Sequence, residues 1–556
     1  MSTLPTALKN SRCILHIDLD CFYCQVEQVR LGIPFDVPAA VQQWRGLIAV
    51  NYAARKFGVE RHTDIDDAKK ICPNIKLLHV ATYGPNDTEP RYHPNPDRST
   101  HKICLDPYRD ASREIFKIFY KYCNTIQKIG SDEGFLDVTE TVNQRLIERY
   151  LNRMPQLLDK LHDQDCGVLI DWHTLGVVVT SPDEDTSESS EKQWNTTTWR
   201  DLQLAIGAEL AKEIRKEVYD KLQYTCSAGI AHYKTVAKLC SSKNKPNNQT
   251  VLREAARLNF MADVPFKKIR NLGGKLGNEV GSDLEISNAS ELWKYSKKEL
   301  QDKFGISTGL YVYNICRGVD DEEVSSTKAP KSLMAAKAFN SAINNPTEMQ
   351  PWFSILSVEL HKRILRNYED FGTWPKNIVM HYRSSGSHRT KAIGSLHKGD
   401  MKNHENLLKK FQQSYNSIPD AYPCFGLDLI ASGLSHDESS KSHTLNRFFT
   451  TSSSSAHLAN STINQPAEPT KNKNLFFKKP PSVNVKPTVD VEHAETWVCD
   501  NCKQTVSVAD IGEHTDYHFA LEISQQDDTA SVKRRKPPPA NEDKKKKVNN
   551  FFLPRS

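Results

Sequence analysis

Long apolar runs are scarce in this chain of 556 residues. A membrane-spanning helix needs about 20 apolar residues in succession, and because no such run occurs we expect no membrane span. The first ten residues also lack the apolar core of a secretory signal. Hydrophobic residues make up only 38% of the chain, which is low for one compact body and predicts that part of the chain is solvated tail.

An excess of one charge is also missing from most of the chain. The net charge of +6 comes from 74 Lys and Arg against 68 Asp and Glu. The segment 533–547 alone accounts for this excess, with eight basic residues against two acidic ones. The total charge therefore identifies no partner for the rest of the chain, and only local charged patches can do so.

Regularly spaced cysteine pairs are missing as well. Of the 13 cysteines, only Cys499 and Cys502 form a CxxC pair, and the others are scattered among predicted helices and strands. This is typical of reduced cysteines that act as small apolar fillers, so we expect a reducing, intracellular compartment.

Composition divides the chain into zones. Residues 12–434 alternate apolar runs with helical patterns, including an amphipathic repeat over 206–222, and predict an α+β fold with a largely antiparallel sheet. The acidic insert 182–199 predicts an exposed loop. Residues 435–494 are rich in Ser, Thr, Asn and Pro and predict disorder, because they cannot bury enough apolar surface. A short island follows near 495–523, and then a basic tail.

Two strand-like runs within the folded zone end in acidic residues. The run 13–17 leads into Asp18-Leu19-Asp20. The runs 125–129 and 135–138 flank a turn that contains Asp132 and Glu133, which predicts a hairpin. Carboxylates at the ends of apolar strands are costly unless cations or solvent meet them. For either segment alone, an ordinary acidic strand end is the favoured interpretation.

The neighbouring motifs favour a functional interpretation. They are Cys21-Phe22-Tyr23-Cys24-Gln25-Val26-Glu27-Gln28, the run 49–59 around Tyr52 and Arg55, Ser227-Ala228-Gly229-Ile230, and Asn244-Lys245-Pro246-Asn247. In their order and spacing, these motifs resemble the Y-family translesion DNA polymerases, closest to the polymerase eta branch in a fungal-like form. The resemblance covers about residues 12–434.

The resemblance implies a right-hand-like architecture of palm, fingers, thumb and little finger. A ββα-type zinc finger and disordered tails would follow. The implied domains are palm 1–21 and 99–252, fingers 22–98, thumb 253–325, little finger 326–434, disordered linker 435–494, ubiquitin-binding zinc finger 495–523, and disordered tail 524–556.

The resemblance also implies a magnesium site. Nucleotidyl transfer needs two Mg²⁺ ions, and hard oxygen ligands suit them. By similarity, the ligands are the carboxylates of Asp18, Asp132 and Glu133 and the main-chain carbonyl of Leu19. Asp20 lies beside them but is no ligand in the family pattern. Ser131 stands where the family usually has an apolar residue.

The incoming nucleotide would meet a second set of residues. Tyr52, Arg55 and Lys245 match the family's triphosphate contacts, and Arg61 matches a residue that lies over the base and phosphates. Gln42 matches a residue near the template base, with Gln43 as a competitor for that position. Tyr23 matches the position that packs against the sugar and excludes a 2′-hydroxyl, so we expect a preference for deoxynucleotides.

Two basic segments predict a DNA-binding surface. Residues 226–275 hold ten Lys or Arg and two acidic residues, and the run 269–277 resembles a helix-hairpin-helix turn. Residues 376–398 hold five Lys or Arg and no carboxylate. This segment contains the predicted strand 377–382, and a second predicted strand follows at 425–430. Strand-borne basic residues would bind the duplex backbone without sequence preference.

The island near 495–523 has the ligand spacing of a tetrahedral zinc site, made by Cys499, Cys502, His514 and His518. With six carboxylates and one lysine between residues 495 and 522, DNA phosphates would repel it. The run 514–522 resembles the ubiquitin-binding zinc finger of the same polymerases, in which Asp516 matches a helix residue that contacts ubiquitin.

The tails carry motifs for other partners. Three Phe-Phe pairs stand at 448–449, 476–477 and 551–552, and paired aromatics in a polar background are natural docking anchors. Val548, Phe551 and Phe552 resemble the motif that binds proliferating cell nuclear antigen, and other Phe-Phe pairs would suit other translesion polymerases. The lysine and arginine clusters of 533–547 predict a two-part nuclear import signal, with a generic basic tail as the alternative.

Together these features predict a nuclear, Mg²⁺- and Zn²⁺-binding translesion DNA polymerase. It would use primer–template DNA and deoxynucleoside triphosphates, and ubiquitinated proliferating cell nuclear antigen would recruit it. Two alternatives stay open: a Y-family polymerase with a different lesion preference, and a non-catalytic adaptor for ubiquitin and the sliding clamp. The intact Asp18, Asp132 and Glu133 argue against the adaptor.

Overall fold

The computed structural model describes residues 8, 10–85, 87–153, 166, 168–180, 198–384 and 387–436, together with the backbone of two short strands, β18 (Thr496–Val498) and β19 (Thr505–Ser507). The chain divides into two units, Met1–Ser454 and Ser455–Ser556. In the second unit, β18 and β19 form an antiparallel pair. No helix in the described part of the chain is long and apolar enough to span a bilayer.

A six-stranded mixed sheet forms the centre of the first unit, in the order β7-β8-β1-β10-β11-β9. The first four strands are antiparallel, whereas β10, β11 and β9 run parallel, so the sheet is less antiparallel than the sequence predicts. The strands are β1 (Ile14–Leu19), β7 (Ile126–Lys128), β8 (Glu133–Asp137), β9 (Val177–Val179), β10 (Cys226–Ala231) and β11 (Gln249–Leu252). The predicted hairpin around Asp132 is therefore confirmed as β7–β8.

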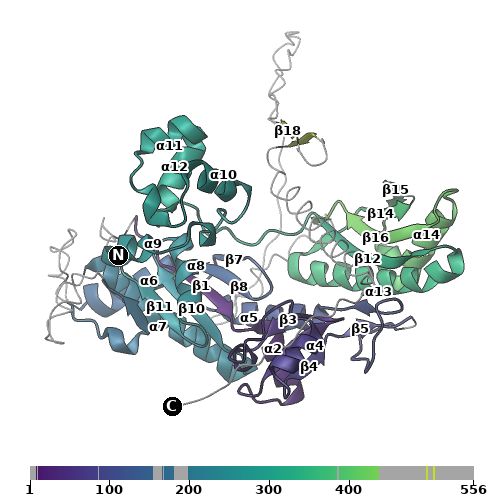
Figure 1. Cartoon of the computed structure of the whole chain (residues 1–556), viewed down its shortest axis with the longest axis horizontal. Helices are drawn as coiled ribbons and strands as arrows, with labels where there is room; N and C mark the ends of the chain where they lie inside the picture. The colour runs from purple at the N-terminus through teal and green to yellow at the C-terminus, as the bar shows by residue number, and fades with distance from the viewer. Residues whose placement is uncertain are drawn as a thin grey trace, which may run out of the picture. The chain divides into compact units, whose positions relative to one another are not determined.

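Alternation along the strands decides which helix covers which face of this sheet (Figure 1). Leu15 and Ile17 of β1 and Ile230 of β10 point into one core, which the long helix α7 (Trp199–Leu222) covers. The residues in between, such as Gly229, face α8 (Lys234–Lys243). A Cβ atom on Gly229 would lie 1.9 Å from the carbonyl oxygen of Ala237, so only glycine lets α8 lie this close to the sheet. The core under α7 also takes side chains from α2 (Phe22–Leu31), α5 (Asp106–Phe119), α6 (Thr139–Leu146), η1 (Ile147–Leu151) and η3 (Trp172–Thr174).

A smaller three-stranded sheet, in the order β3-β2-β4, has a core of its own. Its elements are β2 (Ala39–Gln43), β3 (Gly46–Val50), α3 (Tyr52–Arg55), α4 (Ile65–Ile71) and β4 (Lys76–His79). The hairpin of β2 and β3 leads directly into α3. Helix α2 follows β1 of the central sheet and contacts both β2 and β3, which links the smaller sheet to the end of β1.

A helical segment follows the central sheet and packs around a third core. It consists of η5 (Glu254–Ala256), α9 (Arg257–Ala262), η6 (Phe266–Lys268), α10 (Lys275–Leu284), η7 (Ala289–Leu292), α11 (Lys297–Phe304) and α12 (Ile306–Ile315). Between η6 and α10 the chain makes the tight turn that the sequence predicts at 269–277. A Cβ atom on Gly277 would lie 1.6 Å from the carbonyl oxygen of Leu272, so the turn requires glycine there.

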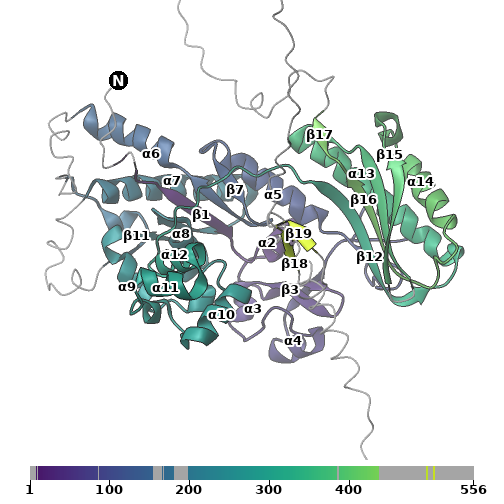
Figure 2. The ribbon, with the colours of Figure 1, turned by 90° about the horizontal axis from the view of Figure 1, so that it is seen from above.

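The last folded segment is an antiparallel sheet in the order β12-β16-β14-β15, drawn in green in Figures 1 and 2. Its elements are β12 (Ser332–Ile343), α13 (Pro346–Phe371), β13 (Thr373–Trp374), β14 (Asn377–Ser384), β15 (Ser387–Ser395), η8 (Lys398–Met401), α14 (His404–Asn416), β16 (Cys424–Ser432) and β17 (Ser435–His436). Both strands predicted here, at 377–382 and 425–430, are confirmed, and they are neighbours.

Residues from much earlier in the chain complete the core of this four-stranded sheet. Tyr83 of the short strand β5 (Thr82–Tyr83) and Cys104, which follows its partner β6 (Lys102–Ile103), are buried among its apolar side chains. Lys102 Nζ lies 2.6 Å from Glu359 Oε2 of α13, and both side chains are almost completely buried. Segments some 250 residues apart therefore share one core.

Candidate active site

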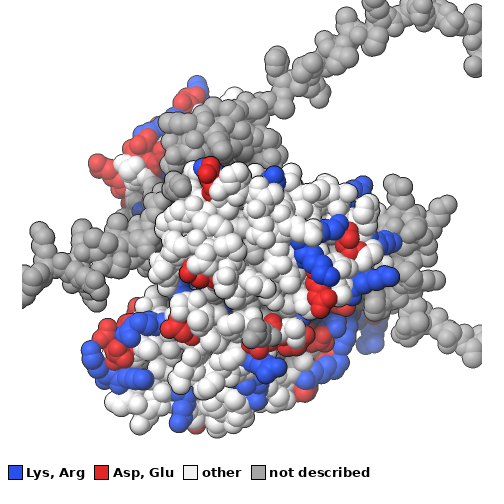
Figure 3. All heavy atoms as spheres, turned by 90° about the vertical axis from the view of Figure 1, so that its right-hand side faces the viewer, with Lys and Arg blue, Asp and Glu red and all other residues white. Residues whose placement is uncertain are grey.

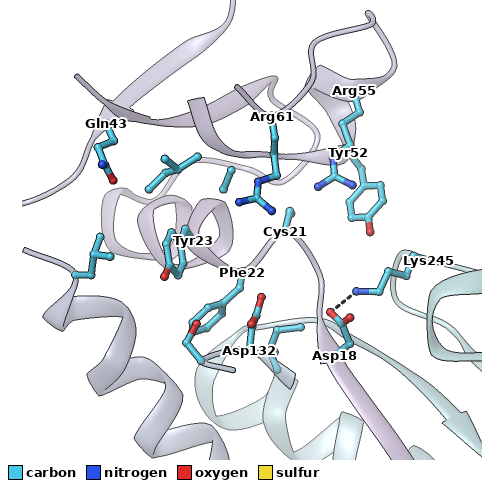
Figure 4. Close-up of a pocket in the computed structure, with 15 residues that line it drawn as sticks. Asp18, Cys21, Phe22, Tyr23, Gln43, Tyr52, Arg55, Arg61, Asp132 and Lys245 are labelled. Atoms are coloured by element: carbon cyan, nitrogen blue, oxygen red, sulfur yellow. Dashed lines mark hydrogen bonds and ion pairs between the residues drawn. The ribbon is translucent and has the colours of Figure 1, made fainter. Parts of the chain in front are cut away.

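The two acidic turns meet at the end of β1. In the antiparallel pairing of β1 and β8, Asp18 stands directly opposite Glu133. The amide of Leu19 donates a hydrogen bond of 2.9 Å to the carbonyl oxygen of Asp132, which fixes the turn against the strand. Asp18, Leu19 and Asp132 line one cavity of about 500 Å³ (Figure 4). The four predicted metal ligands are therefore neighbours at the end of β1: three line the cavity, and Glu133 stands beside Asp18 on the paired strand.

Cationic and hydroxyl side chains from the smaller sheet form the opposite wall of this cavity. Tyr52 and Arg55 lie on α3, a short helix that begins where the Asn51 side chain accepts a hydrogen bond of 2.9 Å from the amide of Ala54. Figure 4 shows Tyr52, Arg55 and Arg61 across the cavity from Asp18 and Asp132. A negative and a positive wall therefore face each other, as binding of a metal–polyphosphate complex requires.

Lysines contact two of the three carboxylates. Lys245 Nζ pairs with Asp18, and Lys238 Nζ lies 2.6 Å from Glu133 Oε2. Burial raises the pKa of Asp18, against the opposing effect of Lys245. Burial and then the charge of Glu133 raise the pKa of Asp132. Burial acts in the same direction on Glu133, but contacts with His16 and Lys238 lower the pKa of Glu133 to about 2. Neighbouring cations therefore do not fully offset the cost of burying the charged carboxylates of Asp18 and Asp132.

The donor set fits a divalent metal. Among the described residues, no three His, Cys, Asp or Glu side chains are grouped so that they could hold a metal ion, and lysines contact Asp18 and Glu133. Even so, the carboxylates together with the Leu19 carbonyl are the hard oxygen ligands that Mg²⁺ prefers. The raised pKa values of Asp18 and Asp132 show that an added cation would stabilise their ionised forms.

Asp20 is held by hydrogen bonds within the protein. Its side chain is almost completely buried and accepts hydrogen bonds from Thr225 Oγ1 (3.0 Å), Ser227 Oγ (2.8 Å) and the amide of Asn247 (2.8 Å). The last of these bonds holds the loop that carries Lys245. Asp20 therefore positions a cation of the site rather than a metal.

Tyr23 stands in the cavity on a rigid support. Its ring stacks on the ring of Tyr108 with centroids 4.0 Å apart and planes at 11°. The Tyr108 hydroxyl donates a hydrogen bond of 2.8 Å to Glu27 Oε1, and Glu27 is fully buried. Neither Tyr108 nor Glu27 was singled out from the sequence, because nothing in the local pattern of α5 or α2 marks a contact between them.

The structure places Gln43 in the cavity, and not Gln42. The register of β2 against β3 shifts between Val41 and Gln42, which turns the following side chains. Gln42 Nε2 then donates a hydrogen bond of 2.6 Å to the carbonyl oxygen of Trp44 and lines a neighbouring cavity instead. Of the two candidates named from the sequence, Gln43 is therefore the one that lines the cavity.

The two basic segments are less uniform than their composition suggests. In residues 226–275, Lys234 is fully buried and its Nζ donates 2.7 Å to Gln127 Oε1, while buried Arg253 pairs with Asp201 at 3.0 Å. These two cations stabilise the interior and add nothing to a DNA-binding surface.

In the second basic segment, the pleat divides the strand-borne cations. On β14, Tyr382 faces the helices, so its neighbour Arg383 lies on the opposite face of the sheet. Arg389 of β15 pairs with Tyr382 and therefore lies on the face that the helices cover. The view in Figure 3 likewise shows Lys and Arg interspersed with Asp and Glu over one face of the molecule. Only part of each predicted patch can therefore bind a duplex.

Several predictions lie outside the described residues. They are the loop at 182–197, the disorder of the linker and tail, the zinc ligands Cys499, Cys502, His514 and His518, the ubiquitin contact Asp516, the clamp motif with Val548, Phe551 and Phe552, and the helix of the ββα finger.

Family models match three parts of the chain. Residues 17–242 match the impB/mucB/samB family, residues 264–319 match the helix-hairpin-helix motif of DNA polymerase eta and Rev1, and residues 495–526 match the ubiquitin-binding zinc finger. The last match implies a bound zinc ion. The prediction of a helix-hairpin-helix turn at 269–277 is confirmed by the second match.

Curated relatives agree with these matches. The chain is 32% identical to the N-acetyltransferase eso1 of Schizosaccharomyces pombe over 93% of its own length and 62% of the relative's. It is 33% identical to DNA polymerase eta of Arabidopsis thaliana over 72% of its own length and 58% of the relative's. It is 34% identical to DNA polymerase eta of Drosophila melanogaster over 67% of its own length and 42% of the relative's. The chain thus spans less than two thirds of each of these relatives.

Proposed function

Because the chain carries a Y-family polymerase domain followed by the polymerase eta/Rev1 helix-hairpin-helix motif, we propose that it is a DNA-directed DNA polymerase that performs translesion synthesis. The substrates are primer–template DNA and deoxynucleoside triphosphates. One observation carries this proposal: Asp18 and Asp132, with Glu133 opposite Asp18 on the neighbouring strand, lie across a cavity from Tyr52, Arg55 and Arg61.

In this proposal Asp18, Asp132, Glu133 and the Leu19 carbonyl hold two Mg²⁺ ions. When bound, the ions would activate the primer 3′-oxygen and neutralise triphosphate charge. Arg55, Tyr52 and Lys245 bind the triphosphate oxygens. Tyr52 and Arg55 lie on a capped helix, which fixes their positions, and Lys245 lies on a loop tethered by Asp20 and would exchange its contact with Asp18 for the triphosphate.

The same proposal assigns the subdomains. The six-stranded sheet is the palm (1–21 and 99–252), the three-stranded sheet lies in the fingers (22–98), the helical segment is the thumb (253–325) and the four-stranded sheet is the little finger (326–434). Four hydrophobic cores support this division in part: Phe22 and Val41 of the fingers are buried in the core of the palm, and Tyr83 is buried in the core of the little finger. Duplex DNA would contact the Gly-rich turn of the thumb through phosphates.

Primer extension by the purified full chain tests this function. With Mg²⁺, a primed template and all four deoxynucleoside triphosphates, we expect extension on undamaged DNA and across a thymine dimer. Extension that stops at the dimer but proceeds on undamaged DNA would favour a Y-family polymerase with a different lesion preference. Absence of extension on both templates, with DNA binding intact, would contradict the polymerase function and favour a non-catalytic adaptor for ubiquitin and the sliding clamp.

We further propose that the chain acts in the nucleus, where ubiquitinated proliferating cell nuclear antigen recruits it. Support comes from the zinc-finger match at 495–526, from the clamp-like motif with Val548, Phe551 and Phe552, and from the basic clusters of 533–547. Cys499, Cys502, His514 and His518 would hold one structural Zn²⁺ ion.

Replacing Asp516 by Ala is expected to weaken ubiquitin binding, because Asp516 matches a ubiquitin-contacting residue of the finger. Loss of one such charged contact corresponds to about 1.5–3 kcal/mol, or roughly a 10- to 150-fold higher Kd. Titration calorimetry with ubiquitin measures this change. Extension of a primer on naked DNA serves as the control and should be unaffected; an unchanged ubiquitin Kd would exclude the role of Asp516.

A further inference from the structure

His16 lies in the middle of β1, fully buried directly below the carboxylates of the site. Alternation along β1 puts His16 on the same face as Asp18. In the register with β8, His16 stands opposite Phe135, two positions from Glu133. Burying an imidazole is costly unless both of its nitrogens find polar partners. The identity of those partners therefore indicates what the residue does.

The two ring nitrogens link helix α8 to Glu133. Nδ1 lies 2.7 Å from Ser241 Oγ on α8, and Nε2 lies 3.3 Å from Glu133 Oε2, an electrostatic contact without the alignment of a hydrogen bond. The ring packs edge-on against Phe135, with centroids 4.6 Å apart. The close approach of α8 at Gly229 brings Ser241 within reach of the strand.

Ser241 decides which nitrogen of a neutral His16 carries the proton. Its hydroxyl has one proton and two acceptors in reach, His16 Nδ1 and the Lys238 carbonyl oxygen at 2.8 Å. If the proton goes to Nδ1, the N–H at Nε2 faces the carboxylate of Glu133 and stabilises it. If the proton goes to Lys238, Nδ1 must be the donor, and the lone pair of Nε2 would repel Glu133. The first arrangement is the favourable one.

Both contacts to the side chain of Glu133 are made by the same oxygen. His16 and Lys238 both approach Oε2, and among the described residues no hydrogen bond to Oε1 is formed. We propose that His16 and Ser241 form a positioning pair, which holds Glu133 by Oε2 so that Oε1 is presented to a divalent cation. This inference rests on the proposed function of the site. His16 itself touches no substrate and acts only through Glu133.

Metal binding tests the pair without any turnover. The probe is Mn²⁺, measured by its free-ion electron paramagnetic resonance signal, with the full chain bound to a template whose primer lacks the 3′-hydroxyl. Removal of an outer-shell partner of a metal ligand typically weakens metal binding by about 10- to 100-fold, and we expect this for His16→Leu. Ser241→Ala should also weaken Mn²⁺ binding, because Ser241 no longer favours the His16 tautomer that carries its proton on Nε2.

Two further variants separate positioning from packing. His16→Gln should restore most of the affinity, because its amide can donate to Glu133 from nearly the same place. Cys240→Ala removes a buried side chain next to Ser241 on α8 and should leave the Mn²⁺ affinity at the wild-type value.

Equal Mn²⁺ affinity in the wild type, His16→Leu and Ser241→Ala would overturn the inference. Weaker binding in both variants, with rescue by His16→Gln and unchanged DNA affinity, would support it. If the wild type binds Mn²⁺ but extends no primer with Mg²⁺, the proposed function fails, while the comparison of variants still decides whether His16 positions Glu133.

Discussion

The double replacement Asp132→Asn with Glu133→Gln is expected to reduce primer extension by about a thousandfold or more, because metal ligation of this kind contributes several kcal/mol to transition-state stabilisation. The two substitutions keep the shape of the turn but remove two of the three charges that would hold the ions. Single-turnover incorporation of one deoxynucleotide, at saturating DNA and Mg²⁺, measures the effect.

Folding and DNA affinity provide the controls for this experiment. Burial and the neighbouring Glu133 raise the pKa of Asp132, so its charge destabilises the folded, metal-free state. We therefore expect Asp132→Asn alone to keep or raise the melting temperature of the metal-free protein, whereas Glu133→Gln gives up the contacts with His16 and Lys238 that lower the pKa of Glu133 and should lower the melting temperature. Fluorescence anisotropy with labelled DNA should give an unchanged Kd. A double variant that extends primers at the wild-type rate would refute the assignment of the active site.

Replacing Tyr23 by Ala is expected to increase incorporation of ribonucleotides relative to deoxynucleotides. The stack on Tyr108, at 4.0 Å, leaves the Tyr23 ring no room to retreat from a 2′-hydroxyl. Forcing an extra atom into a packed site costs about 1–3 kcal/mol, so relief of this clash corresponds to roughly a 5- to 150-fold change in selectivity. The ratio of kcat/KM for the two nucleotides measures it.

Two conservative variants sharpen the interpretation. Tyr23→Phe keeps the ring and should keep the selectivity. Tyr108→Phe keeps the stack but loses the hydrogen bond to Glu27, so its selectivity should lie near the wild-type value if the ring contact alone holds Tyr23. If Tyr23→Ala discriminates against ribonucleotides as strongly as the wild type, the role of Tyr23 as the sugar-excluding residue is wrong.

Local patterns were enough to predict the elements that carry the chemistry. The apolar runs that end at Asp18 and flank Asp132 are β1, β7 and β8, and the four-residue repeat of 206–222 lies in α7. These elements could be predicted because their signals are short-range: alternation, helical spacing and a tight turn. The parallel arrangement of β9, β10 and β11 could not, since the helical signals of the crossovers through α7 and α8 do not say which strands become neighbours.

Side-chain direction was harder to predict than position. The choice between Gln42 and Gln43 depends on a register shift in β2, which a sequence of similar polar residues does not reveal. The support of Tyr23 by Tyr108 depends on how α2 packs against α5. By contrast, His16 stands two residues before Asp18 in a strand, so a polar side chain on the face of the acidic residues could have been noticed from the sequence.

The burial of Tyr83 and Cys104 in the core around α13 bears on how this chain could be recombined with its relatives. A chimera that exchanges only the C-terminal sheet would pair a foreign α13 with the native Lys102, whose buried partner is Glu359. A mismatched partner there would leave a charge enclosed without compensation, which costs about 3–5 kcal/mol. A compatible exchange must therefore transfer residues 81–104 together with the sheet. The exchanged unit then consists of two segments that are not contiguous in the sequence.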